Sequence, residues 1–287
     1  MSRIAYVNGQ YVRLPEASIH IEDRGYQFAD GIYEVCLVIE GRYWDLEGHF
    51  ARMARSLDEL RIGAPMEASA LKIVIRELLR RNRLDNALVY IQTTRGVAPR
   101  NHHFPAGDVA PALVMTARRF DLDQSDAQAA KGVAVITQPD IRWSRVDIKT
   151  IGLLPNALAK QAAKEAGAAE AWLIRDGHVT EGSSSNAWIV DASGVLITHP
   201  KTNDILGGIT RETAIACAEG LQMKVEERPF TLEEAMAAPE AFMSSATGLV
   251  MPIVKIDGKA VGTGTPGPVT MRLRERYKKI ASNCDEH

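Results

Sequence analysis

One lysine of the sequence lies in an apolar stretch, where its charge is unusual. The segment DIKTIGLLPN, residues 147–156, places Lys149 directly after Ile148 and shortly before Ile151. An ammonium group buried in such surroundings without a partner is costly. Either the aliphatic stem lies on apolar surface while the nitrogen reaches water, or the amine forms a Schiff base with a carbonyl compound. The lysine alone leaves both interpretations open.

Two polar segments further along could hold a cofactor or an anion. The segment VTEGSSSN, residues 179–186, joins the carboxylate of Glu181 to a glycine, three serines and an asparagine, which is typical of a solvated turn or of a compact polar corner. The segment LGGITRET, residues 206–213, places two glycines before a predicted helix start. The free N–H groups at Ile209 and Thr210 could bind a phosphate there, because the positive end of the helix dipole favours an anion. Thr210 as a plain N-cap is the alternative.

A third polar segment follows a predicted strand. TRGVAPRNHHFP, residues 94–105, carries Arg95, Arg100, His102 and His103 in a loop broken by proline. A guanidinium beside imidazoles suits bidentate capture of a carboxylate, although solvated loop charges would have the same pattern. A histidine pair also suggests zinc, but no third ligand lies at a useful spacing, so we expect no metal site.

The first half of the chain is predicted to contain antiparallel strands and two helices. RIAYVNGQYVRL and GIYEVCLVIEGRYWDL alternate apolar and polar residues around Asn8-Gly9 and Glu40-Gly41, which predicts two hairpins. HFARMARSLDELRIG and ASALKIVIRELLRRN have apolar residues at helical spacing. ALVYIQTTRG and PALVMTARR are predicted strands.

The second half begins with the strand GVAVITQ, the loop that carries Lys149 and a helix from about Asn156 to Ala166. AEAWLIRDG and NAWIVDASGVLITH are predicted strands on either side of VTEGSSSN. Further helices are predicted from about Thr210, over TLEEAMAA and over TMRLRERYKKIA. The mixture of hairpins and helices, without regular βαβ alternation, predicts two α+β domains and not a doubly wound sheet.

A polar segment separates the two halves. RRFDLDQSDAQAAK has no strand periodicity and predicts a linker. We therefore expect a smaller N-terminal α+β domain over residues 1–120, a linker over residues 121–130, and a larger C-terminal α+β domain over residues 131–287 that carries Lys149.

Composition narrows the class of function. Among 287 residues, 34 Lys and Arg nearly balance 36 Asp and Glu without long basic runs, so we expect neither nucleic acid nor a membrane as partner. Cys36, Cys217 and Cys284 are far apart and form no CxxC pair, which favours a reducing cytoplasm. No run approaches the roughly 18 apolar residues of a membrane span, and MSRIAYVNGQ lacks the apolar core of a signal peptide. These features predict a cytoplasmic protein that acts on small molecules.

Taken together and in order, the motifs carry a resemblance to a known family. RGYQFADGIYEV, TRGVAPRNHHFP, DIRWSRVDIKT, VTEGSSSNAW and LGGITRE follow one another nearly at the spacing of fold-type IV pyridoxal-phosphate aminotransferases. The sequence most resembles the bacterial D-amino-acid aminotransferases, from about Ile4 to Gly258. The resemblance implies a two-domain α+β fold with pyridoxal 5'-phosphate in the cleft between the domains. It also implies a homodimer in which partner residues complete each site.

The resemblance assigns an activity and three cofactor contacts. It implies transfer of the amino group of a D-amino acid, such as D-alanine, to a 2-oxo acid, 2-oxoglutarate, by a ping-pong mechanism. Lys149 would form the Schiff base with the cofactor and serve as acid and base. Glu181 would pair with the pyridine nitrogen and keep it protonated. Leu206 would pack on the ring.

The resemblance also implies a phosphate site with two departures from the family. Arg52 in HFARM and the N–H groups of Ile209 and Thr210 would hold the phosphate. Ala246 stands where the family usually has a threonine that contacts the phosphate, and Leu249 replaces an acidic residue.

For the substrate, the resemblance implies that Tyr33, Arg100 and His102 bind the α-carboxylate. Leu37 occupies a position that is often basic in relatives, so the side-chain preference does not carry over. An L-branched-chain aminotransferase and an aminodeoxychorismate lyase share the scaffold, and Arg100 with His102 argues against both. A catalytically inactive relative is disfavoured because Lys149 and Glu181 are both present.

Overall fold

The computed structural model describes residues 3–281, and its contacts divide the chain into two compact units. Among the described residues, unit 1 comprises residues 3–121 and Ile148–Gly152, and unit 2 comprises Leu122–Asp147 and residues 153–281. No helix among these residues is long and apolar enough to cross a membrane.

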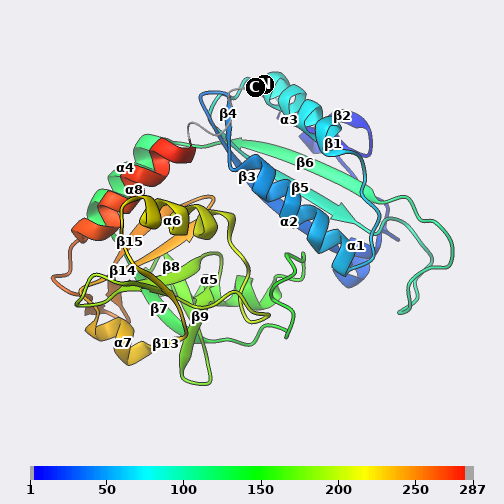
Figure 1. Cartoon of the computed structure of the whole chain (residues 1–287). Coiled ribbons are helices and arrows are strands. Elements are labelled where there is room, and N and C mark those ends of the chain that lie inside the picture. Colours follow the sequence, from blue (N-terminus) through cyan, green and yellow to red (C-terminus); the bar gives the residue numbers. More distant parts are fainter. Residues whose placement is uncertain (1–2, 282–287) are drawn as a thin grey trace. The chain divides into compact units, whose positions relative to one another are not determined.

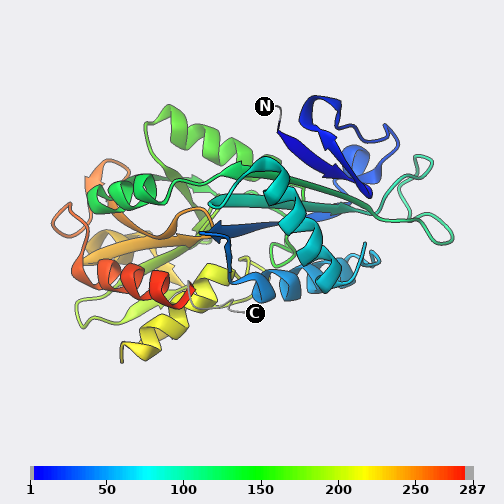
Figure 2. The same cartoon turned by 90° about the horizontal axis from the view of Figure 1, so that it is seen from above.

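The sheet of unit 1 is antiparallel, with strand order β2-β1-β6-β5-β3-β4 (Figure 1). Its strands are β1 Ile4–Val7, β2 Gln10–Arg13, β3 Gly31–Ile39, β4 Arg42–Trp44, β5 Ala87–Thr94 and β6 Ala112–Arg119. Its helices are η1 Leu14–Glu16, α1 Arg24–Phe28, α2 Leu46–Glu59 and α3 Ala68–Asn82. Figure 2 shows α2 and α3 on one face of the sheet, where their apolar sides form a core with the strands.

Both predicted hairpins are confirmed. Asn8 and Gly9 have φ values of 45° and 93°, and Glu40 and Gly41 have φ values of 53° and 76°. A two-residue type I′ turn requires positive φ at both positions, which asparagine and glycine adopt most readily. Local turn chemistry therefore fixes the register of β1 with β2 and of β3 with β4.

Unit 2 contains a ten-stranded mixed sheet, in the order β12-β11-β10-β14-β15-β7-β8-β9-β13 with β16 paired to β15. Its strands are β7 Val133–Pro139, β8 Glu170–Arg175, β9 His178–Gly182, β10 Asn186–Val190, β11 Leu196–Thr198, β12 Val225–Glu227, β13 Phe230–Thr231, β14 Glu240–Ser245, β15 Leu249–Ile256 and β16 Lys259–Ala260. Its helices are α4 Leu122–Lys131, α5 Leu154–Glu165, α6 Ile209–Gly220, α7 Leu232–Ala237 and α8 Pro268–Ala281.

Alternate residues of β8 show how this sheet is covered on both faces. Ala171 and Leu173 belong to a small core cluster with Ala163 of α5, whereas Trp172 belongs to the main core cluster with Phe230. Successive side chains of a strand point to opposite faces, so a strand with helices or loops on both sides is apolar throughout.

The predicted linker is wrong, because the segment forms helix α4. Ser125 and Ala129 are buried, and the acidic Asp126 pairs with Arg274 and Lys278 of α8 at 2.8 and 2.6 Å. Polar composition indicated a linker, but the polar side chains of this helix are held by partners far away in the sequence.

The position of Lys149 also differs from the prediction, since its segment groups with the N-terminal unit. The Tyr33 N–H donates to the Lys149 carbonyl at 3.0 Å, and the Ile151 N–H donates to the Gly31 carbonyl at 3.1 Å. These bonds align residues 148–152 with the start of β3. The C-terminal part of the chain therefore supplies a segment to unit 1.

We predict that Arg274→Met destabilises unit 2 by about 2–3 kcal/mol, because it removes the buried donor to two backbone carbonyls and to the partly exposed Asp126. Arg274 is 1% exposed and donates to the carbonyls of Gly248 and Val250 as well as to Asp126. Urea unfolding followed by circular dichroism measures the effect. Arg272→Met on the exposed side of the same helix is the control, and equal midpoints for both variants would contradict this role.

Candidate active site

In unit 1, Lys149 lies beside the start of β3 with its amine over an aromatic ring. Its nitrogen Nζ is 4.1 Å from the ring centroid of Tyr33, and its backbone N–H donates to Ser56 Oγ at 3.4 Å. The side chain is half-buried, and no carboxylate among residues 3–281 pairs with it. The amine is therefore held against a ring without a carboxylate partner among these residues, which suits reaction with a carbonyl compound.

The ring of Tyr33 is itself fixed. It stacks on Tyr90 with centroids 5.6 Å apart, and the Tyr90 hydroxyl donates to Gln92 Oε1 at 2.7 Å. Burial, with a contribution from Tyr33, raises the pKa of Tyr90 to about 12, so this phenol stays neutral. The structure thus brings Tyr33 and Lys149 together on a rigid support.

Beside them, the fully buried carboxylate of Glu34 holds Arg52, whose side chain is 10% exposed, in an ion pair. Arg52 donates to Glu34 from Nε at 2.8 Å and from Nη2 at 2.7 Å, and His49 Nδ1 lies 2.7 Å from the same carboxylate. Burial favours a raised pKa for Glu34, but the charge and hydrogen bonds of Arg52 and His49 outweigh it and lower the pKa to about 2. Arg52 is therefore held in one orientation as a permanent cation, by partners that the sequence did not reveal.

A neighbouring thiol takes no part in this chemistry. Cys36 is fully buried, and burial together with the charge of Glu34 raises the pKa of its thiol well above the ordinary range. A protonated thiol is a poor nucleophile.

In unit 2, Glu181 is a buried carboxylate at the end of β9. It accepts hydrogen bonds from Asn186 Nδ2 at 2.8 Å, from the Leu206 N–H at 3.2 Å and from Arg142 Nη1. The structure therefore brings together two predicted residues, Glu181 and Leu206, and adds Asn186 and Arg142. The last two lie in the quoted motifs VTEGSSSN and DIRWSRVDIKT, but only the motif around them pointed to a site.

Arg142 is balanced by a second carboxylate. Asp140 accepts from its Nε at 2.9 Å and from its Nη2 at 2.7 Å. Burial opposes ionisation of Asp140, but the hydrogen bonds and charge of Arg142 lower its pKa to about 2, and the two carboxylates raise the pKa of Arg142 above its usual range. Glu181, Arg142 and Asp140 therefore form a charged row that favours an anionic Glu181.

The first turn of α6 has no side-chain cap from its N-cap residue. Its N-cap is Gly208, which has no side chain to cap the helix, so the alternative of Thr210 as N-cap is wrong. A Cβ on Gly208 would lie 2.0 Å from Asn186 Oδ1, so only glycine fits beside the Glu181 cluster. Uncapped N–H groups at Ile209 and Thr210 are suited to an anion such as phosphate.

The turn between β14 and β15 contains the two departures from the family. Ser245 Oγ accepts from the Gly248 N–H at 3.0 Å and lies 3.4 Å from Thr247 Oγ1. Leu249 is fully buried with a φ of 57°, so an apolar side chain suits this position. Ala246 is half-exposed in this turn and adds no donor.

Arg100 and His102 lie elsewhere in unit 1, on the loop between β5 and β6. Both contact Phe28, at 4.9 Å from the Arg100 guanidinium carbon and 5.6 Å from the His102 ring centroid. In the part of the chain that the structure describes, no hydrogen bond, ion pair or ring contact joins them to Tyr33 or Lys149. Of the three residues predicted to bind the carboxylate, the described chain brings Arg100 and His102 together at Phe28 and leaves Tyr33 with Lys149.

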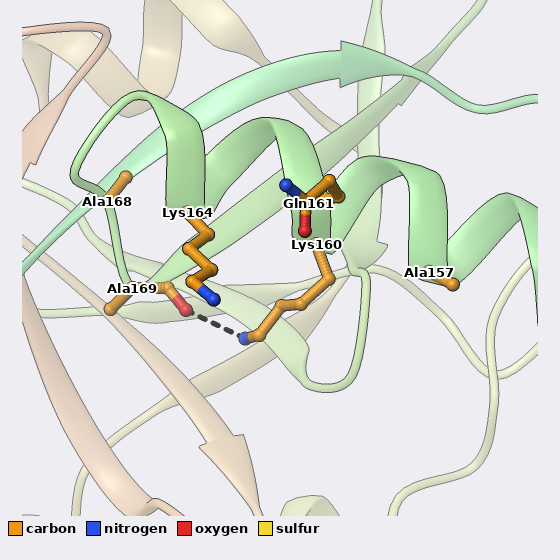
Figure 3. Close-up of a pocket in the computed structure, with 6 residues that line it drawn as sticks. All are labelled: Ala157, Lys160, Gln161, Lys164, Ala168 and Ala169. Atoms are coloured by element: carbon orange, nitrogen blue, oxygen red, sulfur yellow. Dashed lines mark hydrogen bonds between the residues drawn. The ribbon is translucent and has the colours of Figure 1, made fainter.

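A surface depression in unit 2 lies away from the predicted site residues. Figure 3 shows a surface depression along α5, where Lys160 Nζ donates to the Ala169 carbonyl at 2.7 Å, and no predicted site residue lines it. Within residues 3–281, no three His, Cys, Asp or Glu side chains are placed to hold a metal ion.

Known protein sequences resemble this chain over most of its length. The model of the family described as Amino-transferase class IV matches residues 31–256. A D-alanine aminotransferase of Staphylococcus haemolyticus is 42% identical over 274 residues, which cover 96% of this chain and 96% of the relative. A D-alanine aminotransferase of Bacillus licheniformis is 41% identical over 93% of each chain.

Solved structures give the same family at lower identity. A branched-chain amino acid aminotransferase of T.th., complexed with N-(5'-phosphopyridoxyl)-L-glutamate, is 27% identical, with a TM-score of 0.88 over 100% of this chain and 96% of that one. The branched-chain aminotransferase of Thermoproteus uzoniensis with norvaline is 26% identical, with a TM-score of 0.86 over 100% and 97%. These similarities confirm the predicted fold class, and the chain belongs to the class IV aminotransferase family.

Proposed function

We propose that this protein is a pyridoxal-phosphate-dependent aminotransferase that transfers the amino group of a D-amino acid, such as D-alanine, to a 2-oxo acid, 2-oxoglutarate. The observation that carries the substrate class is the 42% identity, over 96% of both chains, to a D-alanine aminotransferase. The branched-chain enzymes are similar in fold but only 27% and 26% identical. They supply the alternative substrate class for the test below.

The donor sets of the two units fit pyridoxal phosphate. The Lys149 amine, which has no carboxylate partner within residues 3–281, suits its aldehyde. The buried carboxylate of Glu181 suits a protonated pyridine nitrogen, and the first turn of α6, which has no side-chain cap, suits its phosphate. When bound, the cofactor accepts the electrons left by a broken Cα–H bond. We assign its binding to Lys149, Glu181, Arg52, Leu206, Ile209 and Thr210.

In this proposal, one lysine moves the proton. The Lys149 Nζ would act as the base that takes the proton from the substrate Cα and, once protonated, as the acid that delivers it to the carbon of the former aldehyde. The first 2-oxo acid leaves before the second binds, and the same groups then act in reverse order. The Tyr33 ring supports the amine on one side.

Glu181 stabilises the proton on the ring nitrogen of the cofactor and does not transfer a proton itself. Its carboxylate accepts from Asn186, Leu206 and Arg142, which favour the anion, and an anion at this point favours a protonated ring nitrogen. We assign the α-carboxylate of the substrate to Tyr33, Arg100 and His102. Among the described residues, Arg100 and His102 lie together at Phe28 without a contact to Tyr33, which supports a site completed by a second copy.

We further propose a cytoplasmic homodimer. Each unit exposes large apolar side chains: Ile21 and Tyr26 are 75% and 74% exposed in unit 1, and Leu154 and Leu158 are 72% and 56% exposed in unit 2. Apolar surface of this kind is typical of an interface with another subunit. Sedimentation velocity is expected to give twice the chain mass, and an active monomer would contradict the proposal.

The direct test offers D-alanine, L-alanine and L-leucine separately to the purified holoenzyme with 2-oxoglutarate. We expect a 2-oxo acid product, pyruvate, from D-alanine only. Lys149→Ala is expected to abolish this product and the visible absorption of the bound cofactor, because no other amine replaces it. Product from L-leucine but not D-alanine would favour the branched-chain alternative, and full activity of Lys149→Ala would remove this lysine from the mechanism.

Glu181→Gln is expected to lower kcat by about ten- to hundredfold, since a neutral amide no longer favours the ring proton, and a hydrogen bond to a charged group contributes roughly 1.5–3 kcal/mol. Asp140 still balances Arg142 in this variant, so the fold is retained. Glu219→Gln on exposed α6 surface is the control. A rise in KM with unchanged kcat would assign Glu181 to binding alone.

A further inference from the structure

The ring of Phe28 gathers three side chains of unit 1 that carry or can carry positive charge. The guanidinium carbons of Arg24 and Arg100 lie 4.7 and 4.9 Å from its centroid. The His102 ring lies 5.6 Å away at an interplanar angle of 57°. Phe28 is the last residue of α1, and Ala29 ends that helix with a φ of 54°.

The base of this cluster is rigid, because two buried arginines share the carboxylate of Asp30. Arg24 is 2% exposed and donates to Asp30 from Nε at 2.7 Å. Arg95 donates to both oxygens of the same carboxylate, at 2.7 and 2.9 Å. Arg24 Nη1 also donates to the Asn101 carbonyl at 2.7 Å, which fixes the backbone between Arg100 and His102.

Arg100 differs from these two arginines. Its side chain is exposed, and among residues 3–281 no carboxylate pairs with it; its contact is with the ring of Phe28. An arginine held by a ring keeps its N–H donors for another acceptor, and a carboxylate matches their fork geometry.

We propose that Phe28 is a positioning residue, whose ring holds Arg100 and His102 side by side so that both bind the α-carboxylate of the substrate. This inference rests on the proposed function. Free in solution, the Arg100 side chain would sample many rotamers, and each binding event would have to fix one of them. The ring fixes the guanidinium beforehand at the edge of a backbone that Arg24 already holds.

The effect is expected in substrate binding and not in the chemical step. A carboxylate contact is made equally in the ground and transition states, so its loss raises KM and leaves kcat unchanged. Loss of the Arg100 contact with the Phe28 ring and of the Phe28–His102 ring contact is expected to raise KM about fivefold or more. Because both amino acids and 2-oxo acids carry the carboxylate, both KM values should rise together.

The experiment uses the holoenzyme with Phe28→Leu, which removes the ring, and Phe28→Tyr, which retains it. We measure kcat and KM for D-alanine and 2-oxoglutarate, and the dissociation constant of propionate by NMR line broadening. Phe28→Leu is expected to raise both KM values and the dissociation constant of propionate about fivefold or more at unchanged kcat. Phe28→Tyr, which keeps the ring, is expected to leave these constants at their wild-type values. Arg100→Ala removes the carboxylate contact itself and is expected to raise the same KM values about ten- to hundredfold.

Phe104→Leu is the matched control on the same loop, because the Phe104 ring lies 3.7 Å from the Arg95 guanidinium carbon and not against Arg100. Equal effects of Phe28→Leu and Phe104→Leu would assign the effect to loop order and overturn the proposal. So would unchanged KM and propionate binding in Phe28→Leu, or a fall in kcat alone. The propionate measurement needs no turnover, so absence of activity on D-alanine would overturn the proposed function while leaving the role of Phe28 measurable.

Discussion

The buried pair of Glu181 and Arg142 is the interaction on which the candidate site of unit 2 depends. Arg142 also donates to Asp140, to Thr180 Oγ1 and to the Asp204 carbonyl. Segments around residues 140, 180 and 204 therefore meet at one guanidinium. Burying such charges is costly unless each has a partner. The network around Arg142 therefore joins these three segments and also provides the buried Glu181 carboxylate with a cationic partner.

Unit 1 also contains a buried carboxylate that pairs with an arginine. Glu34 lies on β3 and holds Arg52 and His49 of α2, which joins the helix to the sheet across the apolar core between them. The carboxylate is fully buried and nevertheless ionised, because the charges and hydrogen bonds of its two partners lower its pKa by more than burial raises it. In both units, a buried acid orients an arginine, and the surrounding apolar residues keep water from competing for the arrangement.

The features that follow from local chemistry could be predicted from the sequence. The Asn8-Gly9 turn needs positive φ, and α2 needs an apolar stripe; both are visible within a few residues. The features that depend on distant partners could not be predicted. The polarity of α4 is satisfied by α8, about 150 positions later, and the role of Arg142 depends on Glu181, 39 positions later. The proposed roles at Lys149 and Glu181 came from ordered motifs, whereas Glu34, Asp140 and Phe28 needed three-dimensional contacts.

The pairing of residues 148–152 with β3 has a consequence for the order in which the chain is made. Among the described residues, the backbone passes between the two units three times, after Asp121, before Ile148 and after Gly152. A nascent chain that ends at Asp121 already contains all six strands of the first sheet, yet it lacks the lysine. The strands beside this segment are thus synthesised first and the lysine later, so a fragment that ends at the apparent boundary would contain all six strands of the sheet without Lys149.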